Sequence, residues 1–410
     1  MEEINALITL LSRSLSMWRF GFFFHEMALG LFTVLLPLYI VGIGGSLVDI
    51  GVMSAIGLFS AIPFSFFWGY MCDKTRRYKR FILLSFLSLA IILYLFTLTT
   101  DVYLLIILYV AMQILHIAHE PSKNVLIAES YSRQEWERTF ALYEGFTEIG
   151  VLIGLLSGLL MSTYRFGTTS MLLLCSLLNL AAFAASIMLI TDPLFVFERR
   201  LVNLEKTVNF AYRGIILASK MWSGISIGGR LKRENLLAFC SGLVLFSFAT
   251  SVLFTPLPIF FSKDLALTEG LVFAVFVLNS GEGVIGYFLA GSKSRDQEGK
   301  AVISKIVLFR SILAFLLIAV LQIPAYNVVL AMAILILMGL FYGLFLVNVL
   351  SISMELIPEG KAGLFNVLVS IGGVCGSFIG PFLAQTVGFI YVFLTTGIIF
   401  LLSYVAFKLS

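Results

Sequence analysis

Long apolar runs separated by short polar breaks dominate this sequence. A membrane-spanning helix needs about 20 mostly apolar residues, and the breaks divide the chain into twelve such segments. A membrane β-barrel would alternate polar and apolar residues over segments of about ten positions, which runs such as LSLAIILYLFTL do not do. We therefore predict an all-α membrane protein with helices at 17–42, 47–71, 81–100, 103–128, 139–163, 168–191, 236–261, 269–291, 301–322, 326–350, 361–385 and 388–408.

Composition and motifs exclude several other classes. The chain is 60% hydrophobic and 12% charged, and its mean hydropathy is +1.03 over 410 residues, which does not describe a soluble globular protein. The four cysteines stand at scattered spacings that predict neither a disulfide framework nor a thiolate metal site. A phosphate-binding loop is missing from the sequence, and HEMAL at 25–29 lacks the second histidine of an H-E-x-x-H protease motif. We expect neither an ATP-driven pump nor an enzyme.

Lysine and arginine residues set the expected orientation, because they gather in the cytoplasmic loops of membrane proteins. With the N-terminus inside, the loops placed outside carry only Arg165 and Lys263 of the 27 Lys and Arg residues. The N-terminus is acidic at its start and lacks a small-residue cleavage site, so the first span is expected to remain in the mature chain. We expect a multi-pass protein of the cytoplasmic membrane with both termini cytoplasmic.

The longest polar interval divides the chain into two sets of six spans. We expect an N-terminal six-helix bundle over 1–191, a basic cytoplasmic linker over 192–235 and a C-terminal six-helix bundle over 236–410. The linker mixes basic and apolar residues, so it is either a helix lying on the anionic inner leaflet or a solvated connection. A single basic linker does not predict nucleic-acid binding.

Weak internal repeats relate the two halves. The pairs are LPL at 36–38 with LPI at 257–259, GY at 69–70 with GY at 286–287, and a glycine ladder at 150, 154 and 158 with one at 372, 376 and 380. Many transporters are built from such duplicated bundles, and glycine ladders allow helices to approach closely. The ladders fit ordinary helix packing and need no substrate.

The loop after the second span carries a more specific pattern. GYMCDKTRRYKRFILL at 69–84 resembles the signature of the major facilitator superfamily, and LPLYIVGIGGSLVDIGVMSAIGLFSAIPF at 36–64 and PSKNVLIAESYSRQEWERTFAL at 121–142 resemble further parts of that family. The likeness extends over nearly the whole chain. It implies two pseudo-symmetric six-helix bundles, in a monomer, that rock around a central cavity. Within the family, the drug/proton antiporters are the group that the chain is expected to resemble.

The same resemblance implies a cytoplasmic gate formed by Gly69, Asp73, Lys74, Arg76 and Arg77. In the family the loop aspartate meets the N-terminal end of span 11, here near residues 360–363, where a helix N-terminus favours an anion. The basic neighbours are expected to reach glutamates at 129, 135 or 137, unless they only obey the positive-inside rule. The chain departs from the signature at Arg76, which stands where a second glycine is usual, and at Ala290 in the second copy.

Ionisable residues lie at depth in several spans. In span 4, His116, His119, Glu120 and Lys123 fall within an arc of about 100° on a helix, so they share one face. A face of this kind avoids lipid, and in the family span 4 lines the cavity. The other members of the expected substrate and proton pathway are His25, Glu26, Glu144, Glu148, Asn279 and Glu282.

These residues suggest the class of substrate. Acids outnumber bases at depth, and no arginine is expected at mid-depth because Arg19 and Arg310 are placed near helix ends. Carriers of organic anions generally need a guanidinium in the cavity, so we expect export of small lipophilic or cationic solutes. Buried carboxyl groups close to one another can exchange protons near neutral pH. We therefore expect a proton gradient as the energy source and no cofactor, with lipid and a small-molecule substrate as partners.

Alternatives stay open at this point. Each glutamate can instead be a fixed interhelical lock. We expect no resident metal, but His25, Glu26, His116, His119 and Glu120 offer imidazole and carboxylate ligands that suit a transient transition-metal site, so a metal carrier is the second hypothesis. Further alternatives are a channel and a receptor or scaffold that does not transport. The sequence names neither the substrate nor the direction of transport.

Overall fold

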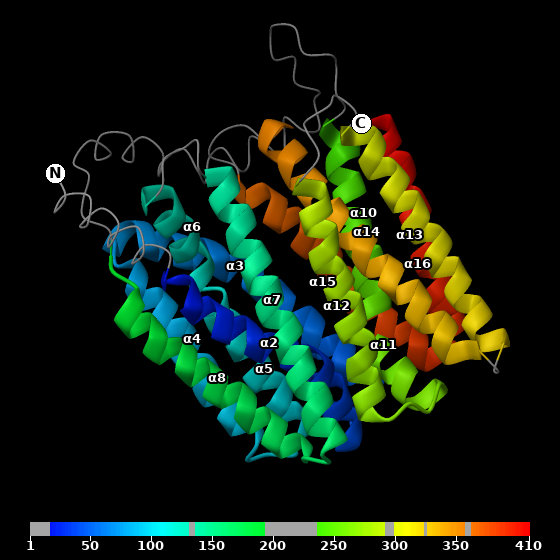
Figure 1. Cartoon of the computed structure of the whole chain (residues 1–410), viewed down its shortest axis with the longest axis horizontal. Coiled ribbons are helices and arrows are strands. Elements are labelled where there is room, and N and C mark those ends of the chain that lie inside the picture. Colours follow the sequence, from blue (N-terminus) through cyan, green and yellow to red (C-terminus); the bar gives the residue numbers. More distant parts are fainter. Residues whose placement is uncertain (1–16, 131–135, 193–235, 292–298, 324–325, 357–361) are drawn as a thin grey trace, which may run out of the picture.

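A computed structural model describes residues 17–130, 136–192, 236–291, 299–323, 326–356 and 362–410 (Figure 1). Within these residues, twelve helical spans are long and apolar enough to cross a membrane, as predicted. Five of the six spans in the first half are single helices, and one is divided into two. The helices of this half are α2 (Arg19–Gly42), α3 (Leu47–Thr75), α4 (Tyr78–Phe96), α5 (Val102–His116), α6 (His119–Ser130), α7 (Trp136–Thr163) and α8 (Thr168–Leu189).

The second half begins with a span that is interrupted near Pro256 and Pro258. A short helix and a π-helical turn complete this span before the next helix begins. The elements of this half are α10 (Leu236–Phe254), α11 (Leu257–Ile259), η2 (Phe260–Asp264), α12 (Glu269–Gly291), α13 (Gly299–Gln322), α14 (Asn327–Leu356), α15 (Ala362–Thr386) and α16 (Phe389–Leu409).

The two halves repeat the same helix contacts. In the first half, α2 packs on α7 and α8, and α4 packs on α5 and α8. In the second half, α10 packs on α15 and α16, and α13 packs on α14 and α16. The pair α3 and α5 corresponds in the same way to α12 and α14. Figure 1 shows the half from α2 to α8, coloured blue to green, beside the half from α10 to α16, coloured green to red, and the predicted pair of pseudo-symmetric six-helix bundles is confirmed.

The two glycine ladders occupy equivalent places in this arrangement. A Cβ atom on Gly154 of α7 would overlap the carbonyl oxygen of Met27 on α2, and one on Gly376 of α15 would overlap that of Phe248 on α10. Glycine is therefore required wherever the backbones of these helices cross so closely. The ladders serve helix packing, as the sequence predicts.

Span 4 differs from its prediction because it is broken. The sequence predicts one helix over 103–128, but α5 ends at His116 and α6 begins at His119. Pro121 explains the break, since its ring clashes with the carbonyl group four residues earlier and it has no amide hydrogen to donate. The His116 carbonyl oxygen instead accepts hydrogen bonds from Ser85 Oγ at 3.0 Å and His119 Nδ1 at 2.6 Å. The break places two histidines beside each other.

The two halves meet through α3 with α15 and through α7 with α12. At the end of the molecule opposite the start of α2 and the end of α16, the Val48 amide donates to Gln385 Oε1 at 2.8 Å (Figure 1). Near the same end, a Cβ atom on Gly51 would lie 3.2 Å from Pro381, and Gly158 packs against the ring of Phe273. The halves are therefore in close contact at this end.

The predicted domain limits remain predictions, because residues 193–235 of the linker lie outside the described residues. The surface of the bundles carries many exposed large apolar side chains, such as Phe59, Ile107 and Leu177. Exposed apolar side chains over long helices are typical of a protein that faces lipid.

Candidate functional site

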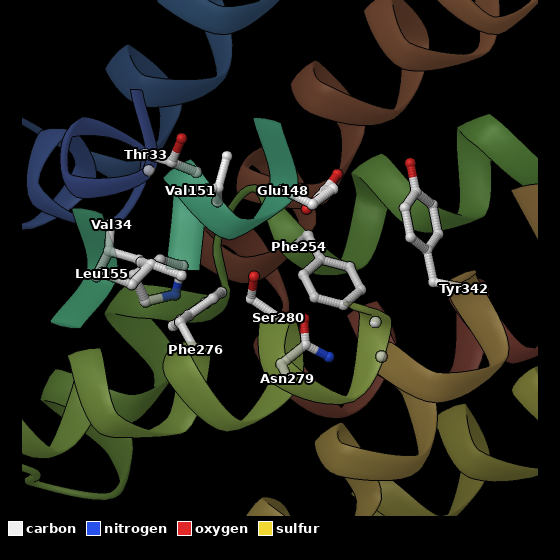
Figure 2. Close-up of a pocket in the computed structure, with 14 residues that line it drawn as sticks. Thr33, Val34, Glu148, Val151, Leu155, Phe254, Phe276, Asn279, Ser280 and Tyr342 are labelled. Atoms are coloured by element: carbon white, nitrogen blue, oxygen red, sulfur yellow. The ribbon is translucent and has the colours of Figure 1, made fainter. Parts of the chain in front are cut away.

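A cavity of about 230 Å³ lies between the two halves. Both bundles line it, through helices α2 and α7 on one side and α10, α11, α12 and α14 on the other (Figure 2). Its lining residues are Gly30, Thr33, Val34, Glu148, Val151, Leu155, Phe254, Pro258, Phe276, Asn279, Ser280, Gly283, Gly339 and Tyr342. Ligand sites of duplicated transporters form at such an interface between repeats.

Most of the cavity wall is apolar, and a few polar groups interrupt it. Figure 2 shows Glu148 on one half and Asn279, Ser280 and Tyr342 on the other around the same space. Asn279 Nδ2 donates to the Leu335 carbonyl oxygen at 2.7 Å, which fixes its amide. Among the described lining residues, Glu148 alone carries a charged side chain. The cavity thus offers one carboxylate and several neutral hydrogen-bonding groups.

Two of the pathway residues expected from the sequence, Glu148 and Asn279, line this cavity. Among the described residues of span 4, none lines the cavity. Glu26 lies on α2, where its Cβ atom faces Gly150 of α7. Glu282 lies on α12, next to lining residue Gly283, and is half-buried. The expected pathway set is therefore divided between the cavity, the first bundle and, for Glu282, the second bundle beside the cavity.

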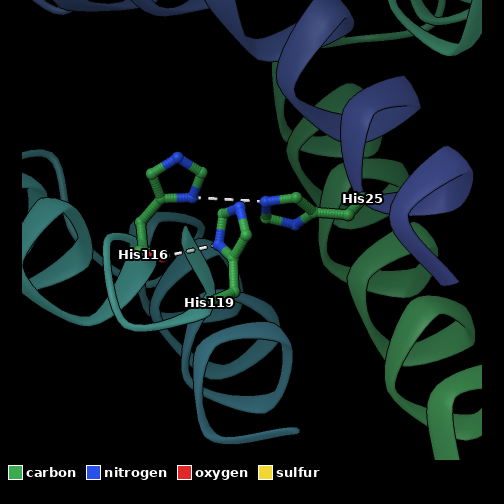
Figure 3. A group of neighbouring side chains, drawn as sticks. All are labelled: His25, His116 and His119. Atoms are coloured by element: carbon green, nitrogen blue, oxygen red, sulfur yellow. Dashed lines mark hydrogen bonds between the residues drawn. The ribbon is translucent and has the colours of Figure 1, made fainter. Parts of the chain in front are cut away.

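The histidines gather inside that first bundle. His25 on α2 and His119 on α6 are buried, and His116 at the end of α5 is half-buried. His25 Nε2 lies 3.2 Å from His116 Nδ1, and His25 Nδ1 lies 2.7 Å from the side-chain oxygen of Asn179 on α8 (Figure 3). The sequence places His116 and His119 on one face; the structure adds His25 from another helix.

An ion-paired group adjoins the histidines. Lys123 Nζ lies 2.9 Å from a Glu120 carboxylate oxygen and 3.9 Å from Glu144 Oε1. The Lys123 ammonium also lies 4.8 Å from the ring centroid of Tyr143 on α7. His119 Nε2 is 3.3 Å from Glu120 Oε1, which joins this group to the histidines. A buried lysine that is surrounded in this way has its charge compensated by partners on α6 and α7.

Arg310 corrects one expectation from the sequence. It lies midway along α13 and is fully buried, and so an arginine does occur at mid-depth. Its guanidinium carbon is 5.0 Å from the ring centroid of Phe246, 5.4 Å from that of Tyr342 and 5.1 Å from that of Phe400. These aromatic faces stabilise the cation away from water. Arg310 does not line the cavity, but it contacts Tyr342, which does.

The residues of the expected gate lie at the end of α3 and the start of α4. Asp73, Lys74 and Arg77 are exposed. Arg76 ends α3 in a left-handed conformation with φ 53°, and its amide donates to the Cys72 carbonyl oxygen at 2.8 Å. A left-handed residue in this place explains why glycine is usual in the family signature. A Cβ atom on Gly69 would meet nothing within 4 Å, so packing does not require that glycine.

The proposed partners of the gate cannot be placed. Residues 131–135 and 357–361 lie outside the described residues, as do the side chains of residues 129 and 137. The contacts that the sequence predicts for Asp73 and its basic neighbours therefore remain predictions.

Sequence reasoning misses several residues that shape these sites. Asn179 and Ser85 hold the histidines, while Ser280 and Tyr342 line the cavity. Asn179 leaves a signal, because it is the single strongly polar residue within the apolar run LLLCSLLNLAAFAA. Ser280 and Tyr342 leave none, since such residues are frequent in membrane helices that pack on one another.

Comparisons with known proteins are consistent with this architecture. The family model described as Major Facilitator Superfamily matches residues 20–366. The chain resembles the crystal structure of nucleoside transporter NupG with a TM-score of 0.71 and 12% identity, covering 96% of this chain and 98% of that one. A structure from work on proton dependent oligopeptide transporters aligns with a TM-score of 0.73 and 15% identity, covering 97% and 96%. No curated protein sequence matches significantly.

Proposed function

The chain belongs to the major facilitator superfamily and is a multi-pass membrane transporter rather than an enzyme, and we propose that it exports small cationic or lipophilic solutes in exchange for protons. The observation that carries this proposal is the cavity between the halves, in which a single carboxylate, Glu148, stands in a mostly apolar wall. The transport would proceed by alternating access, with the two bundles rocking around this cavity.

The contacts between the halves support alternating access. Val48 with Gln385 and Gly51 with Pro381 close the molecule at the end opposite the termini. With the orientation expected from the positive-inside rule, both termini are cytoplasmic and the closed end is the external one. The described conformation then corresponds to a carrier that is shut toward the outside. We propose the cytoplasmic membrane as its location.

The cavity wall supports the substrate class. The Glu148 carboxylate, the charged side chain among the described lining residues, attracts a cation and repels an anion, and low-dielectric surroundings strengthen both effects. Val34, Leu155, Phe254 and Phe276 offer apolar surface to a lipophilic body. The buried Arg310 does not reverse this preference, because its guanidinium is enclosed by aromatic rings outside the lining.

Glu148 is also the proposed proton-exchange group. A carboxyl that meets the solute inside the cavity can bind either the cation or a proton, and this competition couples the two fluxes. Glu120 is less suited to that task than the sequence suggests, because Lys123 already compensates its charge at 2.9 Å. Glu144 lies one helical turn before Glu148 on α7, and the Cβ atom of Glu26 faces Gly150 of the same helix, so both are proposed as further positions on the proton path.

A proteoliposome flux assay tests this function. Organic cations, neutral lipophilic solutes and organic anions would be offered with and without a pH gradient. We expect cation flux that responds to the gradient and that Glu148→Gln reduces by about tenfold or more. The matched control is Glu269→Gln, which changes the same kind of side chain at an exposed position of α12 outside the cavity lining and should leave flux unchanged. Flux that ignores both the gradient and Glu148→Gln rejects proton coupling; large unitary currents would instead identify a channel.

Asp73, with Gly69, Lys74, Arg76 and Arg77, is the proposed cytoplasmic gate. Asp73→Asn removes the anion expected to meet the N-terminal end of span 11. We expect the variant to favour inward-open states, seen as faster labelling of introduced cysteines on the cytoplasmic face and slower labelling on the outer face. Unchanged labelling on both faces would show that Asp73 does not take part in the gate.

A further inference from the structure

All three histidines of the chain converge on one point in the first bundle. They are the only histidines in 410 residues, and they come from α2, from the end of α5 and from the start of α6. One ring nitrogen from each of His25, His116 and His119 lies within 4.8 Å of the others. The cluster is distinct from the cavity, because none of the three lines it.

Neighbouring groups fix the outer nitrogen of two of these rings. Asn179 Nδ2 donates to the Cys175 carbonyl oxygen at 3.0 Å, so its Oδ1 faces His25 and must accept a hydrogen bond from His25 Nδ1 at 2.7 Å. His119 Nδ1 donates to the His116 carbonyl oxygen at 2.6 Å. In a neutral imidazole the second nitrogen then holds a lone pair. His25 Nε2 and His119 Nε2 can therefore both act as ligand atoms, with a metal ion replacing the contact of 3.2 Å between His25 Nε2 and His116 Nδ1.

The lone pair of His119 has no hydrogen-bond partner. Its Nε2 is buried, and it finds no donor among the described residues. Figure 3 shows this nitrogen directed toward the line between His116 and His25. On its other side Glu120 Oε1 lies 3.3 Å away, so two acceptor atoms face each other. A cation beside them removes the repulsion between these atoms.

We propose that His25, His116 and His119 form a binding site for a divalent transition-metal ion, with Zn²⁺ as the best-suited ion. The ligand atoms are Nε2 of His25, Nδ1 of His116 and Nε2 of His119. A tetrahedral Zn²⁺ with Zn–N bonds of about 2.0–2.1 Å requires nitrogen separations of about 3.4 Å, and the His25–His116 separation is already 3.2 Å. A rotation of the His119 ring completes the set. Glu120 or water takes the fourth position.

Ligand type and surroundings select the ion. Imidazole suits zinc and its transition-metal neighbours, whereas Ca²⁺ and Mg²⁺ prefer oxygen ligands. Asn179 and the His116 carbonyl group hold the outer nitrogens, which is the usual way that ligand histidines are oriented. Because the site joins α2 to the break between α5 and α6, the ion is a resident one that fixes the first bundle. The solute of the carrier binds elsewhere.

The metal content of the purified full-length protein tests this site. The protein would carry an affinity tag without histidine and be stripped with a chelator, loaded with Zn²⁺ and dialysed. We expect one zinc ion per chain by mass spectrometry, and a zinc X-ray absorption spectrum with imidazole nitrogen at about 2.0–2.1 Å. His116→Asn should abolish binding, and Asn179→Ala should weaken it by about 10–100-fold. The control Cys72→Ser should leave the zinc content unchanged.

The zinc content and the X-ray absorption spectrum of the wild-type protein test the site even if a histidine variant fails to fold. A zinc-free wild-type protein at micromolar Zn²⁺ would overturn the site. A sulfur ligand shell, or full zinc content in His116→Asn, would overturn it as well. Zinc accumulating inside proteoliposomes with turnover would overturn the assignment as a resident ion. None of these outcomes depends on transport of the organic solute.

Discussion

Lys123 Nζ lies 2.9 Å from a carboxylate oxygen of Glu120, one turn earlier on α6. The lysine side chain is 7% exposed and that of Glu120 is 31% exposed, so this pair is only partly screened by solvent. The aromatic face of Tyr143 covers the ammonium from α7. The pair therefore links the second half of span 4 to span 5.

Replacing Lys123 alone should destabilise the protein. Lys123→Met leaves Glu120 and Glu144 without their cation, and we expect a loss of about 1–3 kcal/mol of stability. The apparent Tm in detergent, followed by tryptophan fluorescence, measures the effect. The double variant Glu120→Gln/Lys123→Met serves as control, because it removes both charges and should regain part of the loss. A single variant as stable as the wild type would show that the pair contributes nothing.

Arg76→Gly should stabilise the protein. Arg76 has φ 53°, a conformation in which an L-residue is strained and glycine is not. We expect a gain of about 1 kcal/mol, measured as a higher apparent Tm. Arg77→Gly is the matched control: it removes the same charge at the next position, where φ is −116°. That control should lose stability. Equal Tm shifts in both variants would mean that the lost charge, and not relieved backbone strain, causes the change in stability.

The glycine ladders predict a position-specific response to alanine. Gly154→Ala and Gly376→Ala place a methyl group against the carbonyl oxygens of Met27 and Phe248. Each should cost about 1–3 kcal/mol through overpacking. Gly145→Ala on the same helix as Gly154 meets nothing within 4 Å, and it should be neutral or stabilise by up to about 1 kcal/mol. The apparent Tm values of the three variants test this prediction. If all three variants change the Tm equally, close helix crossing does not explain the glycines of the ladders.

The sequence predicts the twelve spans and the pseudo-symmetric halves because helix length and polar breaks are local properties of the chain. The break in span 4 was also open to prediction, since Pro121 forbids a regular helix four residues earlier. The approach of His25 to His116 was not, because it depends on how α2 packs on α5 and α8. A helical face indicates which residues point inward, but it does not identify the helix that they meet.

Arg310 shows a second limit of sequence reasoning. Lys305 and Arg310 follow a basic loop that the positive-inside rule assigns to the cytoplasm, so the sequence alone places both near the end of the span. The three rings that enclose Arg310 come from α10, α14 and α16. They are distant in sequence and meet only through tertiary packing. The cavity has the same property, because Glu148 and Asn279 were expected at depth but their shared space is set by the interface between the halves.

Arg310→Met should separate stability from transport. Arg310 Nη1 reaches the Met338 carbonyl oxygen at only 3.4 Å, and Nε and Nη2 have no hydrogen-bond partner among the described residues. A buried cation with so few hydrogen bonds adds little to stability, and an apolar side chain of similar size often replaces it without loss. Charged residues retained within membrane helices generally serve function.

We therefore expect Arg310→Met to keep or raise the apparent Tm while it lowers flux by about tenfold or more. The loss would arise at Tyr342, a cavity residue whose ring lies 5.4 Å from the guanidinium carbon. Arg310→Lys is the control, because it keeps the charge and should retain more flux than Arg310→Met. Flux that survives in Arg310→Met while stability falls would assign Arg310 a purely structural role within the second bundle.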